Sequence, residues 1–238
     1  MKLPKKISPC PIVEAIIEIR FDASLPGDAI FGIIYNMLKD EYTNLEKLPI
    51  LELPDAIRTT DPNLMYSPHY KLRKDNFIIQ IGPKVFSLVN FNEYCGWDLF
   101  YNKTDEVFTK IAALKIINKI KRMGLRYINI FPALNMCEKS NLKINIDNES
   151  FITGINLVLN LPAPPYINTL RMVSSTEAIV ADKVLTGSVI DIDTVLDNVP
   201  DNFFENMNTI INKAHVEEKA LFFNLLKPDY ITTLNPEY

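Results

Sequence analysis

A chain of 238 residues with a formal net charge of −4 is long enough for one large domain or two small lobes, and its charged fraction of 23% is ordinary for a folded protein. Seven glycines and sixteen prolines exclude collagen-like and low-complexity chains, and the negative charge argues against a general nucleic-acid-binding surface. No apolar run in the sequence approaches the ~18 residues that a membrane span requires, and prolines interrupt any apolar core of a signal peptide. The spacing of the three cysteines fits neither a disulfide framework nor a zinc site. We therefore expect a cytoplasmic protein with no cofactor and no bound metal.

The first half of the sequence alternates strand and helix patterns. Strict alternation from Val13 to Phe21 predicts a half-buried strand, and apolar residues at helical spacing after Pro26-Gly27-Asp28 predict a helix. Four prolines break residues 43–76 into short extended pieces and a loop. Residues 76–81 and 85–91 predict a hairpin, and residues 96–101 predict a third strand of the same antiparallel sheet.

A basic segment occupies the middle of the chain. Thr104 is the expected N-cap of a helix that runs to Lys121, with acidic residues in the first turn and basic residues in the last. Gly124 is expected to end this helix and to introduce a strand to Phe131, which we interpret as a hinge between two lobes.

The second half is mainly strands. Residues 141–147, 153–161, 166–174 and 185–196 predict strands, residues 161–165 a rigid bend, and residues 202–226 a long helix, with Tyr230 docking the tail. The predicted class is α+β, with two curved, mainly antiparallel sheets, each packed with amphipathic helices. We expect an N-terminal α+β lobe over residues 1–136 and a strand-rich lobe with a long terminal helix over residues 137–238, or one continuous domain.

The residue types that carry chemistry are sparse. His69 lies in a loop near Ser67, for which it could be a base, although an exposed loop histidine is the commoner case. His215 is expected on the polar side of the last helix. Asp191 and Asp193 share a strand face and could hold Mg²⁺ or Ca²⁺, but a solvated strand face is more common. Nucleophile, phosphate-loop and dinucleotide motifs are missing from the sequence.

The candidate ligand-binding residues lie in three predicted strands, and they are Glu18, Arg20, Trp97, Arg126, Tyr127 and Asn129. Arg20 and Arg126 would clamp an anion, Tyr127 would stack, and Glu18 or Asp191 would hold a metal. In the structural alternative, Arg126 pairs with a carboxylate such as Glu18, since a covered arginine needs a partner. Whether that partner is protein or ligand decides between the two functions below.

The blocks Pro11–Phe21, Gly96–Leu99 and Gly124–Asn129 resemble those of a sporadically distributed family of uncharacterised prokaryotic proteins of similar length. The block Leu125-Arg126-Tyr127-Ile128-Asn129 is the most specific part of this resemblance. The family brings no established activity. Its patchy occurrence implies genes that move horizontally, as defence and toxin–antitoxin genes do.

We favour a non-enzymatic binding or interaction protein, associated with a defence or toxin–antitoxin system, whose partner is another protein or a second copy of this chain. Three observations motivate this hypothesis: the sequence has no recognisable set of catalytic residues, its edge strands are strongly β-forming, and its charges are unevenly distributed. Residues 110–126, for example, hold six basic residues and no acidic one. The alternative is an enzyme or sensor that binds a phosphorylated ligand and depends on a metal. We expect neither nucleic acid nor a membrane as the partner.

Overall fold

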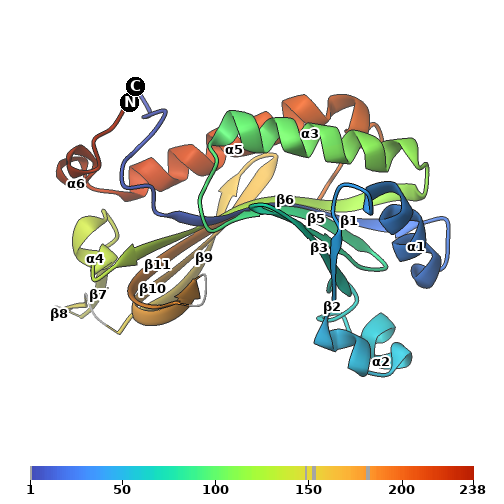
Figure 1. The fold of residues 1–238 in the computed structure, drawn as a ribbon. Helices are drawn as coiled ribbons and strands as arrows, with labels where there is room; N and C mark the ends of the chain where they lie inside the picture. Colours follow the sequence, from blue (N-terminus) through green and yellow to red (C-terminus); the bar gives the residue numbers. More distant parts are fainter. Residues whose placement is uncertain (1, 148, 152–153, 181–182) are drawn as a thin grey trace. The chain divides into compact units, whose positions relative to one another are not determined.

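The computed structural model describes residues 2–147, 149–151, 154–180 and 183–238 (Figure 1). These residues form helices and mainly antiparallel strands, which confirms the α+β class, while the expected curvature and packing of the sheets remain predictions. They divide into two compact units, each made of separated segments. Unit 1 comprises Met1–Ala15, Leu125–Val195 and Asn212–Tyr238, and unit 2 comprises Ile16–Gly124 and Leu196–Ile211.

The boundary of the units inside the central strand falls between Gly124 and Leu125. Both units are discontinuous along the chain, whereas the predicted division into residues 1–136 and 137–238 is contiguous. That division remains a prediction.

Unit 2 holds one side of the strand order, β2-β3-β4-β5-β1-β6. Its elements are β1 (Ile12–Ala23), α1 (Gly27–Leu38), β2 (Asn44–Lys47), η1 (Pro49–Glu52), α2 (Asp55–Thr60), β3 (Tyr70–Lys74), β4 (Phe77–Ile81), β5 (Val85–Phe91), α3 (Trp97–Ala113) and the first part of β6 (Ile117–Pro132). The predicted alternation in β1 is confirmed, because Ala15, Ile17, Ile19 and Phe21 are fully buried. The predicted hairpin is confirmed as the antiparallel pair β4–β5.

Helix α3 covers a face of the unit 2 sheet, and its bounds correct three predictions (Figure 1). The predicted strand at residues 96–101 is wrong, since the helix begins at Trp97. Thr104 is not the N-cap but an interior residue whose hydroxyl donates to the carbonyl of Phe100. The helix ends at Ala113 rather than Lys121, because Lys115 adopts a positive φ of 53°, a conformation that stops helices. Gly124 therefore lies inside β6.

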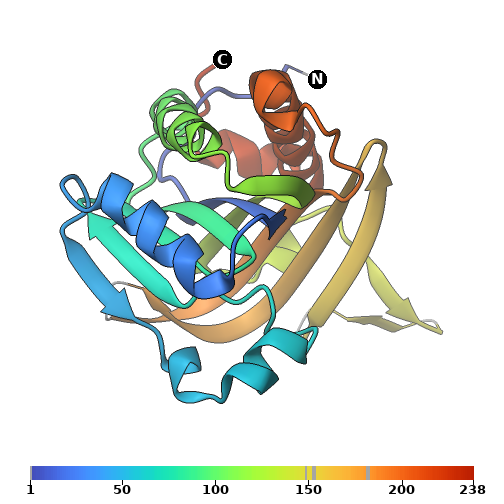
Figure 2. The ribbon, with the colours of Figure 1, turned by 90° about the vertical axis from the view of Figure 1, so that its right-hand side faces the viewer.

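Unit 1 holds the order β1-β6-β11-β10-β9 and a separate β7–β8 hairpin. Its elements are the second part of β6, α4 (Met136–Lys139), β7 (Ile144–Ile146), β8 (Glu149–Phe151), β9 (Asn156–Ala163), β10 (Tyr166–Val180), β11 (Lys183–Leu196), the second half of α5 (Phe203–Leu225) and α6 (Pro228–Thr233). The predicted strands and long helix are confirmed with shifted ends, and the predicted strand start at Thr153 lies outside the described residues. Figure 2 shows β9, in gold, as the outermost strand beside β10.

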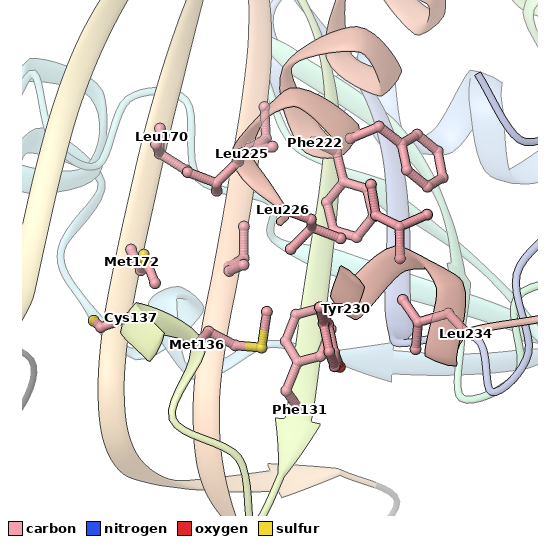
Figure 3. Packing of buried hydrophobic residues seen from close by; sticks show 14 of the residues in the cluster. Phe131, Met136, Cys137, Leu170, Met172, Phe222, Leu225, Leu226, Tyr230 and Leu234 are labelled. Atoms are coloured by element: carbon pink, nitrogen blue, oxygen red, sulfur yellow. The ribbon is translucent and has the colours of Figure 1, made fainter. Parts of the chain in front are cut away.

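The core of unit 1 lies between its sheet and the C-terminal helices (Figure 3). Phe131 of β6 stacks on Phe222 of α5 at a ring-centroid distance of 6.5 Å and meets Tyr230 of α6 edge-on at 6.3 Å. Tyr230 is 8% exposed, so the predicted docking of the tail by this residue is confirmed. Leu170 and Met172 of β10 face the same core, so Arg171 between them faces the opposite side of the sheet.

Candidate functional site

Arg126 lies on the face of the unit 1 sheet opposite the core. Its guanidinium donates two hydrogen bonds to the carboxylate of Asp191 on β11, at 2.7 and 2.6 Å. A nitrogen of Arg171, the register neighbour of Asp191 on β10, lies 3.8 Å from the same carboxylate. The hydrogen bond to Asp191 raises the pKa of Arg126. Arg126 thus directs its bidentate fork at a protein carboxylate.

Glu18 and Arg20 form part of a second charged cluster, in unit 2. Glu18 accepts hydrogen bonds from Arg20 at 2.8 Å and from Arg122 at 3.0 Å. The Arg20 guanidinium also lies over the ring of Tyr66, 5.0 Å from its centroid. The predicted structural role of Arg126 is therefore present, but its predicted partner Glu18 is wrong, since Asp191 takes that place.

Tyr127 and Asn129 face the buried side of β6. Tyr127 is 2% exposed, and its hydroxyl lies 3.2 Å from Nδ1 of His215 on α5. The side-chain amide of Asn129 donates to the backbone carbonyl of Ile190 on β11, at 3.1 Å. Both side chains thus contact protein groups inside unit 1. His215 is partly buried and directs its ring at Tyr127, whereas the sequence predicted a position on the polar side of its helix.

Trp97 stands at the start of α3 in unit 2. Its ring packs at a tilt on Tyr101, with centroids 5.6 Å apart, and edge-on against Phe100 at 6.4 Å. Of the six candidate residues, the structure pairs Glu18 with Arg20, and it places Tyr127 and Asn129 on the other face of β6 from Arg126. Within the described residues there is no group of three His, Cys, Asp or Glu side chains arranged to hold a metal ion.

A small cavity of about 140 Å³ lies in unit 2 beside His69. It is lined by Gly27, Asp28, Phe31, His69, Tyr70, Gly82 and Pro83. His69 is 6% exposed, so the expectation of an exposed loop histidine is wrong. Burial, and then the nearby charge of Arg58, lowers the pKa of His69. The imidazole is therefore neutral at pH 7, with Nδ1 3.4 Å from a nitrogen of Arg58.

The sequence patterns did not indicate the buried carboxyl group of Glu218 on α5. Glu218 is 5% exposed inside unit 1, and burial raises its pKa to about 8. Burial also lowers the pKa of His215, three residues earlier, to about 3. Both side chains are thus uncharged at pH 7, because burial disfavours the charged form of each group.

The most unusual surface feature of unit 1 is its sheet edge at β9. Among the described strands, β9 neighbours only β10, so one side of its backbone borders no other strand. The eight residues Asn156–Ala163 include no charged side chain. Leu157 and Leu161 pack against the core yet are only partly buried, and Val158 on the other face is 51% exposed. The core-facing side of this border is therefore apolar, and the opposite side carries the apolar Val158 between the uncharged Asn156 and Asn160.

The direction of the backbone groups in β9 follows from one hydrogen bond. The amide of Ser174 on β10 donates to the carbonyl of Ile155, so residue 155 points toward β10. Because residues two apart in a strand point the same way, Asn156, Val158 and Asn160 direct their N–H and C=O groups at the free edge. Pro162 belongs to this outward set, and proline is tolerated there because an outward N–H has no ladder bond to lose.

Strand β2, which ends the strand order in unit 2, contrasts with β9. It has only four residues, and two of them are Glu46 and Lys47. Short edge strands with charged side chains are a common protection against unwanted strand pairing. Strand β9 has neither protection, and only Pro162 near its end interrupts its donors.

Comparison with known protein families found no match, and comparison with curated proteins found no similar sequence. In the part of the chain that the structure describes, every helix is too short or too polar to cross a membrane.

Proposed function

We propose that this chain is a binding protein that acts through protein contacts, and that it receives an extended segment of its partner at the free edge of β9. The observation that carries the proposal is the uncharged, eight-residue edge of β9, set against the short and charged edge of β2. A strand that adds to such an edge gains backbone hydrogen bonds, while side-chain pockets select its sequence.

The edge offers both parts of this binding mode. Outward N–H and C=O groups of Asn156, Val158 and Asn160 would supply the hydrogen bonds, each contributing about 0.5–1.5 kcal/mol net. The half-exposed leucines of the core-facing side would gain apolar contacts with alternate residues of the incoming strand. Together these contacts favour extended partners with apolar residues at every second position.

The pairing of the arginines supports binding over catalysis on a phosphorylated ligand. Arg126 directs its fork at Asp191, and Arg20 and Arg122 both contact Glu18. An anion would have to displace these carboxylates, and each would then be left without its cation. The proposal includes membership of the sporadically distributed prokaryotic family and a role in a defence or toxin–antitoxin system, for which the block Leu125–Asn129 is the support.

A displayed library of random peptides tests the binding mode. Peptides selected on the wild-type chain should have apolar residues at alternate positions, and Val158→Pro should weaken them at least tenfold, because proline removes an outward N–H without removing a bond to β10. The control is Val216→Lys, on the exposed side of α5 in the same unit, which should leave binding unchanged. Peptides that bind both variants and the wild type equally would contradict the proposal.

A single-turnover screen tests the competing enzymatic function. Nucleotides and nucleic acid incubated with the chain and Mg²⁺ or Mn²⁺ should remain intact. Metal-dependent hydrolysis that is lost in a folded Arg126→Ala variant would instead favour the enzyme.

A further inference from the structure

The first five of the eight residues of β9 read the same in both directions. Asn156-Leu157-Val158-Leu159-Asn160 is a palindrome, with Val158 at its centre. An antiparallel pair of two identical strands has a twofold axis, so a palindrome matches every residue with an identical one. In this register Val158 faces Val158, Leu157 faces Leu159, and Asn156 faces Asn160 of the second strand.

From this symmetry we infer that the segment received by β9 is the β9 of a second copy of this chain, paired antiparallel about Val158. The inference rests on the proposed function and names its partner. It makes the contact isologous, since the same strand of each copy serves as both donor and acceptor.

The backbone directions fit this register. Val158, Asn156 and Asn160 all point their N–H and C=O groups outward, as the bond between Ser174 and Ile155 establishes. Antiparallel residues that face each other with outward groups exchange both of their bonds. Three such pairs, centred on Val158, form about six backbone hydrogen bonds between the copies. A shift by one residue would place each outward-directed residue opposite one whose backbone groups point toward its own β10, so none of these pairs could form.

The side chains fit it on both faces of the sheet. On the core side, Leu157 meets Leu159 of the other copy in a pair without backbone bonds between its members, where side chains approach most closely. On the opposite face, the two Val158 side chains meet, each 51% exposed in the single chain. The side-chain oxygen Oδ1 of Asn160 accepts a hydrogen bond from the Thr169 hydroxyl, so the side-chain NH₂ group of Asn160 is oriented toward Asn156 of the second copy.

The chemistry of the edge also limits the strength of the dimer. Pairing along one strand buries less than the ~1,200 Å² at the lower end of standard interfaces, so dissociation on the order of micromolar concentrations is expected. Because β9 has no charged residue, added salt should alter the dimer little.

Sedimentation equilibrium of the full chain from ~1 to ~300 μM tests the inference. The wild type should change from monomer to dimer over this range. Val158→Lys and Val158→Glu should each remain monomeric, because like charges would face each other across the axis. An equimolar mixture of the two variants should dimerise again, since lysine of one copy then faces glutamate of the other. The control Val216→Lys should dimerise as the wild type does.

A wild type that remains monomeric throughout would overturn the inference, and so would a dimer that Val158→Lys leaves intact. If both single variants dimerise and mixing them does not make the dimer stronger, the contact between the copies lies elsewhere. Circular dichroism of each variant confirms folding, and the mixture itself shows that both variants are competent. If the chain is monomeric but selected peptides still require the β9 edge, the proposed function stands and only the identity of the partner is wrong.

Discussion

Arg126 and Asp191, 65 residues apart in the chain, form a two-fold hydrogen-bonded ion pair between β6 and β11. Asp191 is almost fully covered, with 8% of its side chain exposed, whereas Arg126 is 36% exposed. An arginine inside an otherwise apolar strand therefore has a protein partner. This pairing favours a structural role for the most conspicuous charged residue of the central strand.

Removal of one member of this pair should destabilise unit 1. Arg126→Ala leaves a covered carboxylate with only the more distant Arg171, so we expect a loss of about 2 kcal/mol in unfolding free energy, at the low end for buried pairs because Arg126 is partly exposed. Urea denaturation followed by circular dichroism measures it. Arg73→Ala, which breaks an exposed pair with Glu46, should lose less than ~1 kcal/mol. Equal losses of unfolding free energy in Arg126→Ala and Arg73→Ala would contradict the bidentate pairing of Arg126 with Asp191.

Glu41 should make unit 2 sensitive to acid. Although burial raises its pKa, hydrogen bonds from Lys103, Lys110 and Lys74 together lower that pKa to about 2. The unfolded value is higher, so this contribution to stability is complete above pH ~4.5 and is lost as the pH falls toward 2. We expect Glu41→Gln to remove about 1 kcal/mol at pH 6 and to flatten the dependence between pH 4.5 and 2. Urea titrations at several pH values measure the unfolding free energy of both proteins, and the same pH dependence in the variant and the wild type would refute this role of Glu41.

Glu218 should act in the opposite direction. Its pKa in the folded chain is raised to about 8, so the unfolded chain loses its proton first and stability falls as the pH rises from ~4.5 to 8. Glu218→Gln removes this penalty and should stabilise the protein by about 1–3 kcal/mol at pH 8.5, with little change at pH 4.5. The exposed neighbour Glu217→Gln should change neither value. Thermal unfolding at both pH values measures the difference, and a destabilised Glu218→Gln at pH 8.5 would count against a protonated carboxyl.

Gly187 should tolerate no side chain. A Cβ at this position of β11 would overlap the carbonyl oxygen of Phe131 and lie 2.9 Å from Cα of Pro132, both backbone atoms of β6. Gly187→Ala should therefore cost about 2–3 kcal/mol. Gly32→Ala in α1 meets no atom within 4 Å and should instead stabilise by about 0.5–1 kcal/mol. Chemical denaturation of the two alanine variants tests this, and a tolerated Gly187→Ala would mean that β6 and β11 can separate.

Local patterns predicted the elements whose burial is decided locally. The alternation of β1 and the helical stripe of α5 have one apolar face each, so the sequence alone indicates them. Residues 97–101 were predicted as a strand because four of the five, all but Asp98, are the aromatic or apolar residues Trp97, Leu99, Phe100 and Tyr101. The helix is instead fixed by Phe100, Val107, Phe108 and Ile111, which pack on the sheet.

The candidate site depended on distances that no local pattern contains. The need of Arg126 for a partner followed from its apolar neighbours, but the choice of Asp191 over Glu18 depends on the pairing of β6 with β11. Burial of His69 and Glu218 likewise results from packing between distant segments, as does the contact of the partly buried His215 with Tyr127. The palindrome of β9 and its missing charges are visible in the sequence, but its place at an edge emerges only from the strand order.

The division of each unit among separated segments affects how the protein is made. The last segment of unit 2 ends at Ile211, and the last segment of unit 1 follows it from Asn212. On a ribosome, all residues of unit 2 would have emerged before the last segment of unit 1. The first residues of unit 1 must wait for that last segment, as the backbone hydrogen bond from Lys5 to Glu237 illustrates. Until then the leucines and phenylalanines of the unit 1 core lack their helical cover. The nascent chain is thus exposed to wrong pairing in the same region that holds β9.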